Sequence, residues 1–379
     1  MPIETIFTNA RLLLEDEVFE GTLVVRDGII AGLAEGRVAG GEDLEGDYLL
    51  PGLVELHTDQ FEAHYRPRPG VRWDVMAALQ AHDAQVASSG ITTVFDCLRL
   101  GTDDGHGYES SELRAMADAV ESAGRQDRLR ADHRLHLRCE VSAPDVLEQF
   151  SGFDKDTFVG VVSLMDHAPG QRQFRKLGLL SYYYKAQRGF SDEEFEACLR
   201  KRQGESARYS EPHRQALAAL CRERGITVAS HDDATVAHVD EAIEHGVRLA
   251  EFPTSVDAAR ASHGAGMSVL MGAPNIVRGK SHSGNIAARD LAEIGVLDVL
   301  SSDYVPFSLI HAPFVLADTV ETIDLPRAIA MVTATPARTV GLDDRGRIAE
   351  GLRADLVRVR RRDGVPVVRG VWREGRRVA

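Results

Sequence analysis

The feature that most constrains this chain is a repeated alternation of short apolar runs with amphipathic segments of about 10–20 residues. Eight such runs occur, and most of them are followed by polar residues and then by helical periodicity. This pattern is typical of βα units and a parallel sheet. Eight strands in about 270 residues match the size of an α/β fold of the (β/α)8 TIM-like barrel type. The expected strands are residues 53–56, 92–96, 135–141, 159–165, 226–230, 247–252, 267–271 and 296–301.

Both ends of the chain have the pattern of short β-strands joined by tight turns. The dipeptides Asp27-Gly28 and Asp363-Gly364 each stand between two apolar runs and predict tight turns. The expected strands are residues 6–14, 22–26 and 29–33 at the amino end and 356–360, 365–368 and 371–373 at the carboxyl end. We therefore expect a small β-sandwich domain formed by both termini. Two independent terminal hairpins are the alternative.

Length and charge limit the kinds of protein that this chain can be. It has 379 residues, with 44 basic and 58 acidic side chains and a formal net charge of -14. The length allows a barrel of residues 51–340 and a small β-domain of residues 1–50 and 341–379. So acidic a chain is a poor match for nucleic acid or an anionic membrane surface, because both require basic surfaces. No run of about 18 apolar residues predicts a membrane span.

Cysteine usage and the first residues indicate the compartment. The four cysteines, Cys97, Cys139, Cys198 and Cys221, are widely spaced and form no CxxC pair. This excludes a zinc ribbon or a disulfide framework and suits a reducing environment. No basic segment followed by an apolar run begins the chain, so no signal peptide is expected. We expect a cytoplasmic enzyme, and a homodimer on base rates alone.

Functional residues of a (β/α)8 barrel lie just past the carboxyl ends of its strands, and here those positions hold imidazoles and carboxylates. His57 and Asp59 are two residues apart on an extended segment, so their side chains point the same way and can share an ion. The expected ligands are His57, Asp59, Glu140, His167, His231 and Asp303. Three imidazoles and three carboxylates predict a mixed nitrogen and oxygen site for one or two divalent ions, zinc first and manganese second.

Each of these residues also has a plainer interpretation. A single histidine at a strand end is more often a hydrogen-bonded core or surface residue, so the prediction rests on several strand ends offering ligands together. Cys139 should face away from Glu140 and pack. Asp232 and Asp233 can instead cap the following helix, and we favour that role for Asp233. Asp303 is the expected general base, because a carboxylate at the last strand can contact both an ion and a water.

Basic residues gather in loops that follow candidate strands. Such concentrated positive charge in an acidic protein predicts a polyanionic substrate, whereas solvated surface charge is the alternative for each loop alone. A helix expected to begin near Asn285 would add backbone N–H groups to a phosphate cradle. His64 is an alternative metal ligand or a phosphate donor. The expected substrate-binding residues are His64, Arg66, Arg68, Arg172, Arg278, Lys280, Ser281 and His282. Residues 204–208 are expected to form a surface loop.

The sequence resembles the amidohydrolase superfamily at both ends of the expected barrel. The run Leu-Pro-Gly-Leu-Val-Glu-Leu-His at residues 50–57 resembles the start of that superfamily's first barrel strand. The run Gly-Leu-Arg-Ala-Asp-Leu-Val at residues 351–357 resembles its return into the β-domain. The usual HxH motif is here His57-Thr58-Asp59, so a carboxylate replaces the second histidine. No lysine stands at the bridging position, and the resemblance leaves Glu140 as the bridging ligand.

Longer motifs are similar to one family within that superfamily, the ribose methylphosphonate triphosphate diphosphatases of the carbon–phosphorus lyase pathway. The similarity runs nearly end to end. It implies metal-dependent hydrolysis of α-D-ribose 1-methylphosphonate 5-triphosphate to the 5-phosphate and pyrophosphate, by an activated hydroxide, in phosphonate catabolism. The motifs are residues 57–59 with Glu62, His64, 67–69 and Trp73, and residues 165–167, 169–174, 230–233, 273–278, 281–285 and 302–304.

Two other functions stay open. An amidohydrolase acting on a cyclic amide or an N-acyl amino acid would need one carboxylate-binding arginine, so several basic loops disfavour it. A non-catalytic scaffold within a phosphonate-processing assembly would have a degraded ligand set, whereas the set here is intact. The leading expectation is a diphosphatase with a small-molecule polyphosphate substrate.

Overall fold

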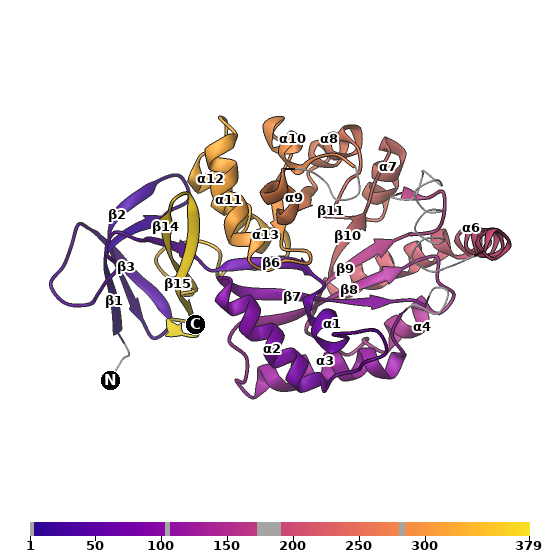
Figure 1. The fold of residues 1–379 in the computed structure, drawn as a ribbon, viewed down its shortest axis with the longest axis horizontal. Coiled ribbons are helices and arrows are strands. Elements are labelled where there is room, and N and C mark those ends of the chain that lie inside the picture. The colour runs from indigo at the N-terminus through magenta and orange to yellow at the C-terminus, as the bar shows by residue number, and fades with distance from the viewer. Residues whose placement is uncertain (1–3, 103–106, 173–190, 280–284) are drawn as a thin grey trace. The chain divides into compact units, whose positions relative to one another are not determined.

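A computed structural model describes residues 4–102, 107–172, 191–279 and 285–379 of the chain (Figure 1). The chain divides into two compact units. The first unit comprises residues 1–96, 119–134 and 271–379, and the second comprises residues 97–118 and 135–270. Within the described ranges, no helix has both the length and the apolar character needed to cross a membrane.

The expected barrel sheet is confirmed. Eight strands pair in the order in which they occur along the chain, and the described pairs are parallel. The sheet is nearly closed, since Thr58 at the end of the first strand forms a parallel bridge with Asp303 just past the last. The strands are β6 (Leu53–Thr58), β7 (Ile91–Leu100), β8 (Asp132–Glu140), β9 (Val159–Met165), β10 (Thr227–His231), β11 (Leu249–Glu251), β12 (Ser268–Gly272) and β13 (Val299–Ser301).

Helices follow these strands, and several begin at a side-chain cap. The Asp74 side chain accepts a hydrogen bond from the Ala77 amide at the start of α2, and Thr235 caps α7. The described helices are α1 (Gln60–Tyr65), α2 (Val75–Ser88), α3 (Ser110–Arg125), α4 (Val146–Ser151), α6 (Asp192–Arg224), α7 (Val236–Glu244), α8 (Val256–Gly264), α9 (Ala273–Arg278), α10 (Ala288–Glu293), α11 (Ser308–Thr319), α12 (Leu325–Ala330) and α13 (Ala334–Thr339).

Two local predictions were wrong, and one helix begins three residues later than the residue named. Residues 204–208 form no loop but lie inside α6, whose buried face carries polar side chains such as Arg202 and Ser206 and so shows no apolar periodicity. The helix expected near Asn285 begins at Ala288. The cap of α7 is Thr235, because the Asp233 carboxylate instead pairs with Arg172.

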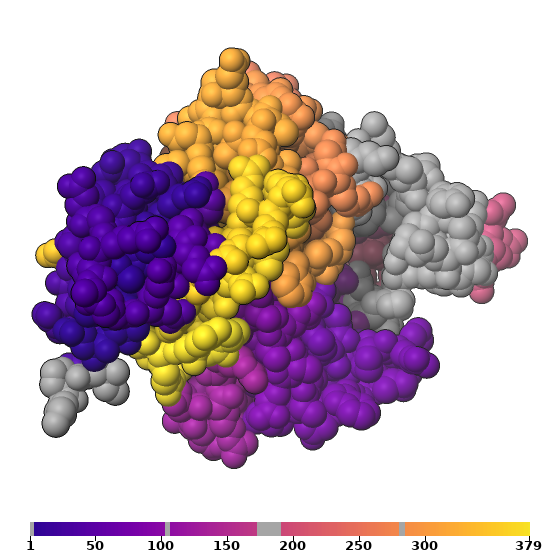
Figure 2. Space-filling model, turned by 60° about the vertical axis from the view of Figure 1, so that its left-hand side comes forward, coloured from indigo at the N-terminus to yellow at the C-terminus, as the bar shows by residue number. Residues whose placement is uncertain are grey.

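Strands from both termini form the second sheet, in the order β16-β15-β14-β5-β1-β2-β3, with β4 paired to β1. In Figure 2 the first strands (indigo) and the last strands (yellow) lie side by side. Antiparallel pairing of β5 with β14 brings Pro51 opposite Leu356, so independent terminal hairpins are excluded. The strands are β1 (Glu4–Leu13), β2 (Val18–Arg26), β3 (Ile29–Glu35), β4 (Glu42–Asp43), β5 (Tyr48–Pro51), β14 (Leu356–Arg362), β15 (Val365–Arg373) and β16 (Arg376–Arg377).

The core and the turns of this sheet also draw on both ends of the chain. Phe7 and Trp372 meet edge to face, with ring centroids 4.9 Å apart, inside one apolar cluster. Asp27 and Gly28 both have positive φ, 49° and 83°, as a two-residue hairpin turn requires. A small β-domain formed by both termini is therefore confirmed, whereas its boundaries at residues 50 and 341 stay a prediction.

A buried polar network joins α2 to β7 and β8 in the first unit. Asp96 of β7 contacts His82 Nε2 through one oxygen, at 2.6 Å, and His133 Nδ1 through the other, at 2.7 Å. His133 Nε2 lies 3.3 Å from Asp83, whose other oxygen pairs with the Arg130 guanidinium at 3.0 Å. Both oxygens of each carboxylate are therefore engaged, as buried charges require.

The protonation of this network follows from its neighbours. Burial alone lowers the pKa of His133, but the charges and hydrogen bonds of Asp96 and Asp83 raise it to about 10. Burial raises the pKa of Asp96, yet the two histidines bring it down to about 2. Burial lowers the pKa of His82. Around neutral pH the carboxylates of Asp83 and Asp96 therefore face the His133 imidazolium and the Arg130 guanidinium, and the charges of the network balance.

The raised pKa of His133 predicts how the free energy of unfolding depends on pH. A histidine in the unfolded chain titrates near pH 6.5, whereas His133 in the folded protein titrates at about 10. The stabilisation from its proton is therefore complete below pH 6.5 and is lost as the pH rises through 10, with a slope of up to about 1.4 kcal/mol per pH unit. Urea unfolding across this range measures it.

The variant His133→Asn isolates this group. It should be less stable than the parent at pH 6.5, and the difference between the two proteins should shrink as the pH rises. His263→Asn, at an exposed position of α8, is the matched control, and its free energy of unfolding should depend on pH as that of the parent does. Parallel curves for the parent and His133→Asn would contradict the assignment.

Candidate metal centre

In the first unit, three expected ligands come together at the closing edge of the barrel sheet. One side-chain ligand atom from each of His57, Asp59 and Asp303 lies within 4.8 Å of the others. The backbone explains this convergence: the Asp303 amide donates to the His57 carbonyl at 3.1 Å, and the Asp59 amide donates to the Asp303 carbonyl at 3.2 Å. Asp303 adopts a positive φ of 54° at this crossing. The structure thus brings these three expected ligands together, and their role as ligands stays a prediction.

The Glu55 side chain also holds these two segments together. One oxygen of its buried carboxylate accepts a hydrogen bond from the His57 amide at 2.7 Å, and the other accepts one from the Ser302 amide at 2.5 Å. The side chain therefore ties the end of β6 to the residues that follow β13. Burial raises its pKa to about 7, although these hydrogen bonds favour the ionised form.

In the second unit, two expected histidines converge on Asp232, for which a role as cap of the following helix was the alternative. His167 follows β9, and His231 is the last residue of β10. Their Nε2 atoms lie 3.6 Å and 3.5 Å from Oδ2 of Asp232. This buried oxygen accepts no hydrogen bond of normal length from any described residue. Asp232 also has a positive φ of 58°, which turns its carboxylate toward the two rings. The adjacency of His231 and Asp232 was the signal for it in the sequence.

Glu140 holds His167 in place. One of its oxygens accepts the His167 backbone amide at 2.9 Å and the Ser142 hydroxyl at 2.8 Å, and the other lies 2.7 Å from His167 Nδ1. Burial opposes ionisation of Glu140, but the His167 charge and hydrogen bonds lower its pKa below the usual range. Burial lowers the pKa of His167, and Glu140 and Asp232 raise it to about 9. These contacts favour an orienting role for Glu140, and its expected bridging role stays a prediction.

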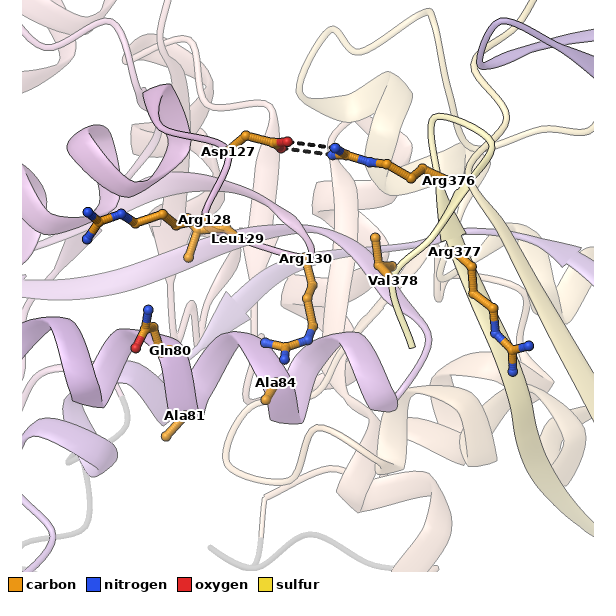
Figure 3. A pocket seen from close by; sticks show the side chains of 10 residues that line it. All are labelled: Gln80, Ala81, Ala84, Asp127, Arg128, Leu129, Arg130, Arg376, Arg377 and Val378. Carbon is orange, nitrogen blue, oxygen red and sulfur yellow. Dashed lines mark hydrogen bonds and ion pairs between the residues drawn. The ribbon is translucent and has the colours of Figure 1, made fainter. Parts of the chain in front are cut away.

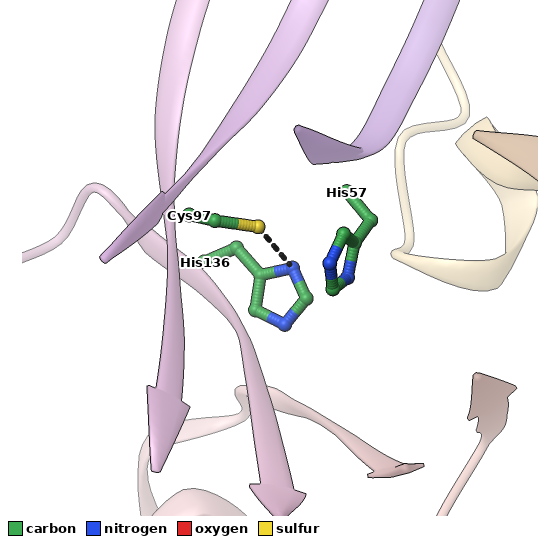
Figure 4. Close-up of side chains that lie close together, drawn as sticks. All are labelled: His57, Cys97 and His136. Atoms are coloured by element: carbon green, nitrogen blue, oxygen red, sulfur yellow. Dashed lines mark hydrogen bonds between the residues drawn. The ribbon is translucent and has the colours of Figure 1, made fainter. Parts of the chain in front are cut away.

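A chain of buried polar groups leads to His231 across neighbouring strands of the second unit. Figure 4 shows Cys97 and His136 pointing toward one another, with Sγ and Nδ1 3.6 Å apart. His136 Nε2 bonds the Ser163 hydroxyl, which donates to Glu251 Oε2 at 2.6 Å. The same Glu251 oxygen lies 3.1 Å from His231 Nδ1. Glu251 thus orients His231 as a carboxylate commonly orients a metal-ligating imidazole. No pattern in the sequence marked it, because it ends a three-residue strand.

The substrate-binding residues expected in the first unit lie on segments that begin at strand ends. His64 is on α1 and its Nε2 atom lies 2.9 Å from Gln85 Oε1 on α2. Arg66 follows α1 directly, and Arg68 is exposed shortly after it. Arg278 ends α9, and its guanidinium donates to the Tyr304 hydroxyl at 3.3 Å, beside Asp303.

The remaining expected substrate residues have a different setting. Arg172 is 5% exposed, and its guanidinium pairs with Asp233 and, at 2.6 Å, with Glu241. Its charge is therefore compensated within its own unit. Lys280, Ser281 and His282 lie outside the described residues.

The donor atoms of both groups fit a divalent cation. Imidazole nitrogens with carboxylate oxygens are the ligands of zinc and manganese sites. A buried carboxylate oxygen without a hydrogen bond, such as Asp232 Oδ2 between two imidazole nitrogens, costs free energy unless a cation compensates it. In each unit the arrangement can therefore hold a cation.

Replacing Glu251 with glutamine tests whether this buried carboxylate supports a metal ligand. The change keeps the shape but removes the charge that orients His231, so metal affinity should fall about 10–100-fold. Competition with a chromophoric chelator measures it. Glu244→Gln, at an exposed position of α7, is the control and should bind as the parent does. Equal affinity in all three proteins would exclude an orienting role for Glu251.

The chain is similar to known proteins in sequence and in structure. The model of the amidohydrolase family matches residues 185–378. Alpha-D-ribose 1-methylphosphonate 5-triphosphate diphosphatase of Escherichia coli (strain K12) is 46% identical over 376 residues, which cover 98% of this chain and 100% of that protein. Imidazolonepropionase of Streptomyces coelicolor is 27% identical over 360 residues, which cover 88% of this chain and 84% of that protein.

Solved structures with the same fold are more distant in sequence. The 5-methylcytosine deaminase from Klebsiella pneumoniae has a TM-score of 0.68 at 16% identity and covers 99% of this chain and 98% of that one. The N-acetylglucosamine-6-phosphate deacetylase from Pasteurella multocida has a TM-score of 0.65 at 14% identity, with 99% of both chains covered. Such likeness supports the fold alone. The family match and a relative 46% identical along nearly the whole of both chains show that the chain belongs to the amidohydrolase family, which comprises metal-dependent hydrolases.

Proposed function

We propose that this protein hydrolyses α-D-ribose 1-methylphosphonate 5-triphosphate to the 5-phosphate and pyrophosphate, as a step of phosphonate catabolism. The observation that carries the proposal is the 46% identity, over 98% of this chain, to a relative named for that diphosphatase activity. Arginines after β6 and β12 support it, since a triphosphate needs several cationic contacts. The reaction consumes one water and breaks one phosphoanhydride bond.

The proposed metal ligands are residues at the strand ends of each unit. We infer that one or two divalent ions, zinc first and manganese second, are held by the side chains of His57, Asp59, His167, His231 and Asp303. Glu140, expected to bridge, acts in this proposal through His167, and Asp232 joins the ligand set because its buried oxygen lies between two imidazoles. A bound ion would lower the pKa of a water and polarise the scissile phosphoanhydride.

Asp303 is the proposed general base. Its carboxylate lies within 4.8 Å of ligand atoms of His57 and Asp59, so it can accept a proton from a water placed at that group. The backbone bonds to His57 and Asp59 hold it at this position. The proton removed from water is then available to the departing pyrophosphate.

The proposed substrate contacts keep the expected residues. Arg66, Arg68 and Arg278 would neutralise phosphate charge, and Tyr304 would orient Arg278 through its hydroxyl. The other members are His64, Lys280, Ser281 and His282, together with Arg172, whose guanidinium is already held by Asp233 and Glu241. Bidentate guanidinium contacts are the strong interactions available to phosphate groups.

We further propose a cytoplasmic location and a homodimer. None of the four cysteines, all within the described ranges, forms a disulfide, which suits a reducing compartment. The dimer is the commonest closed assembly of soluble proteins. Analytical ultracentrifugation of the metal-loaded protein tests the assembly directly.

Phosphorus NMR of the metal-loaded protein with this substrate tests the reaction. We expect pyrophosphate and a 5-monophosphate to appear together, and neither to appear in a chelated control. Sequential release of orthophosphate would contradict the proposal. An unchanged spectrum at verified metal content would also contradict it and would favour the alternative, an amidohydrolase acting on a cyclic amide or an N-acyl amino acid.

Replacing Asp303 with asparagine tests the general base. The amide can still coordinate through its oxygen but accepts no proton, so kcat should fall about 100- to 10,000-fold while metal content is largely retained. Rapid-quench kinetics and metal analysis of the same sample measure both. Asp290→Asn, an exposed change on α10, should leave kcat unaltered. Unchanged turnover in Asp303→Asn would remove Asp303 from this role.

A further inference from the structure

Two arginines of the second unit lie on the strand face that carries Glu140, and neither is among the expected substrate-binding residues. Arg138 is on β8, and Arg99 is near the end of β7, the neighbouring strand. Side chains two residues apart on a strand point to the same face, so Arg138 shares its face with Glu140 and with His136. Arg99 likewise shares its face with Cys97, whose contact with His136 in Figure 4 shows that both arginines lie on one face of the sheet.

Arg99 reaches the carboxylate that holds His167. Its Nη2 atom lies 3.4 Å from Glu140 Oε2, the same oxygen that lies 2.7 Å from His167 Nδ1. This pair is long: elsewhere in the chain Arg376 meets both oxygens of Asp127, at 2.6 Å and 2.8 Å (Figure 3). The Arg99 side chain is also 28% exposed. Its guanidinium therefore lies beside His167 and stays partly open to solvent.

Arg138 acts on Asp232, the carboxylate between the two imidazoles. Burial raises the pKa of Asp232, but its two imidazole neighbours and the charge of Arg138 lower it below the usual value. Arg138 is half-buried, whereas its two neighbours along β8 are fully buried on the other face of the strand. The Arg138 charge is therefore on the side of the candidate ligands and close enough to act on one of them.

These two positive charges have an electrostatic consequence for the candidate ligands. A guanidinium beside imidazole and carboxylate ligands repels a divalent cation that they hold. An anionic group between the cation and the arginines offsets this repulsion, as where arginines and metal ions together hold a phosphoryl group. A guanidinium fork also matches two oxygens of one phosphate. This face of the strands therefore suits a cation together with a phosphate group better than a cation alone.

We propose that Arg99 and Arg138 bind one phosphate group of the substrate's triphosphate, beside His167 and Asp232. The inference rests on the proposed function for the identity of that substrate. It adds two residues that determine specificity, because a substrate without a phosphate at this place leaves both charges without a counter-charge from the substrate. An uncharged cyclic amide is disfavoured here for the same reason.

Equilibrium dialysis of the full-length, metal-loaded protein against radiolabelled pyrophosphate tests the site, with the metal content of each sample measured after dialysis. Arg138→Gln leaves the pair between Arg99 and Glu140 in place and should weaken binding about tenfold at equal metal content, because one charge-assisted contact is lost. Arg99→Gln/Arg138→Gln should weaken it further. In turnover of the proposed substrate, both variants should raise KM by similar factors.

The control is Arg248→Gln/Arg260→Gln, which removes the same charge as the double variant from exposed positions of the second unit and should bind pyrophosphate as the parent does. Parent affinity in Arg138→Gln, no further loss in the double variant, equal weakening in the control, or weakening only in samples that have lost metal would each overturn the proposal. Weakened pyrophosphate binding in a protein that leaves the substrate intact would support the site and contradict the proposed function alone.

Discussion

The closing of the barrel sheet between β6 and the residues after β13 is the constraint on which the candidate site depends. Parallel strands bring their carboxyl ends to one edge, but the position of Asp303 beside His57 and Asp59 needs a fixed register. Two backbone hydrogen bonds and the buried Glu55 carboxylate supply that register. A single side chain thus serves both the fold and the site, since it holds the segment that carries two expected ligands against the segment that carries the expected base.

The architecture was largely predictable because short apolar runs in the sequence mark its strands. All eight barrel strands and the two-ended β-domain follow from alternation of apolar runs and from turn dipeptides such as Asp27-Gly28. Long helices with polar buried faces were not predictable in this way. Residues 204–208 of α6 lie among buried Arg202, Ser206 and Ser210, where hydrogen bonding replaces apolar burial and leaves no periodic signal.

The histidines of the candidate site and three carboxylates at its strand ends were named from the sequence, whereas the contacts of Asp232 and Glu251 with His231 were not. His57, His167 and His231 lie at strand ends, which is where functional residues of a (β/α)8 barrel are found. The sequence left Asp232 open between a ligand and a helix cap, because the choice depends on a positive φ that only the structure reveals. Glu251 ends a short strand, and its partner His231 is distant in sequence. The charge on Arg172 likewise looked available, because Asp233 and Glu241 reach it only in three dimensions.

The buried network around Asp96 also bears on how the chain finds its strand register during folding. Successive side chains on a strand point to opposite faces, so a slip of β7 by one residue would place Cys97 where Asp96 now meets His82 and His133. A thiol offers no charge to an imidazolium, and the displaced carboxylate would lose both partners. Misregistered pairings of β7 are thus penalised electrostatically at a place where apolar packing discriminates little. The network thus favours the native register of β7 over shifted registers, in addition to any stability that it contributes to the folded protein.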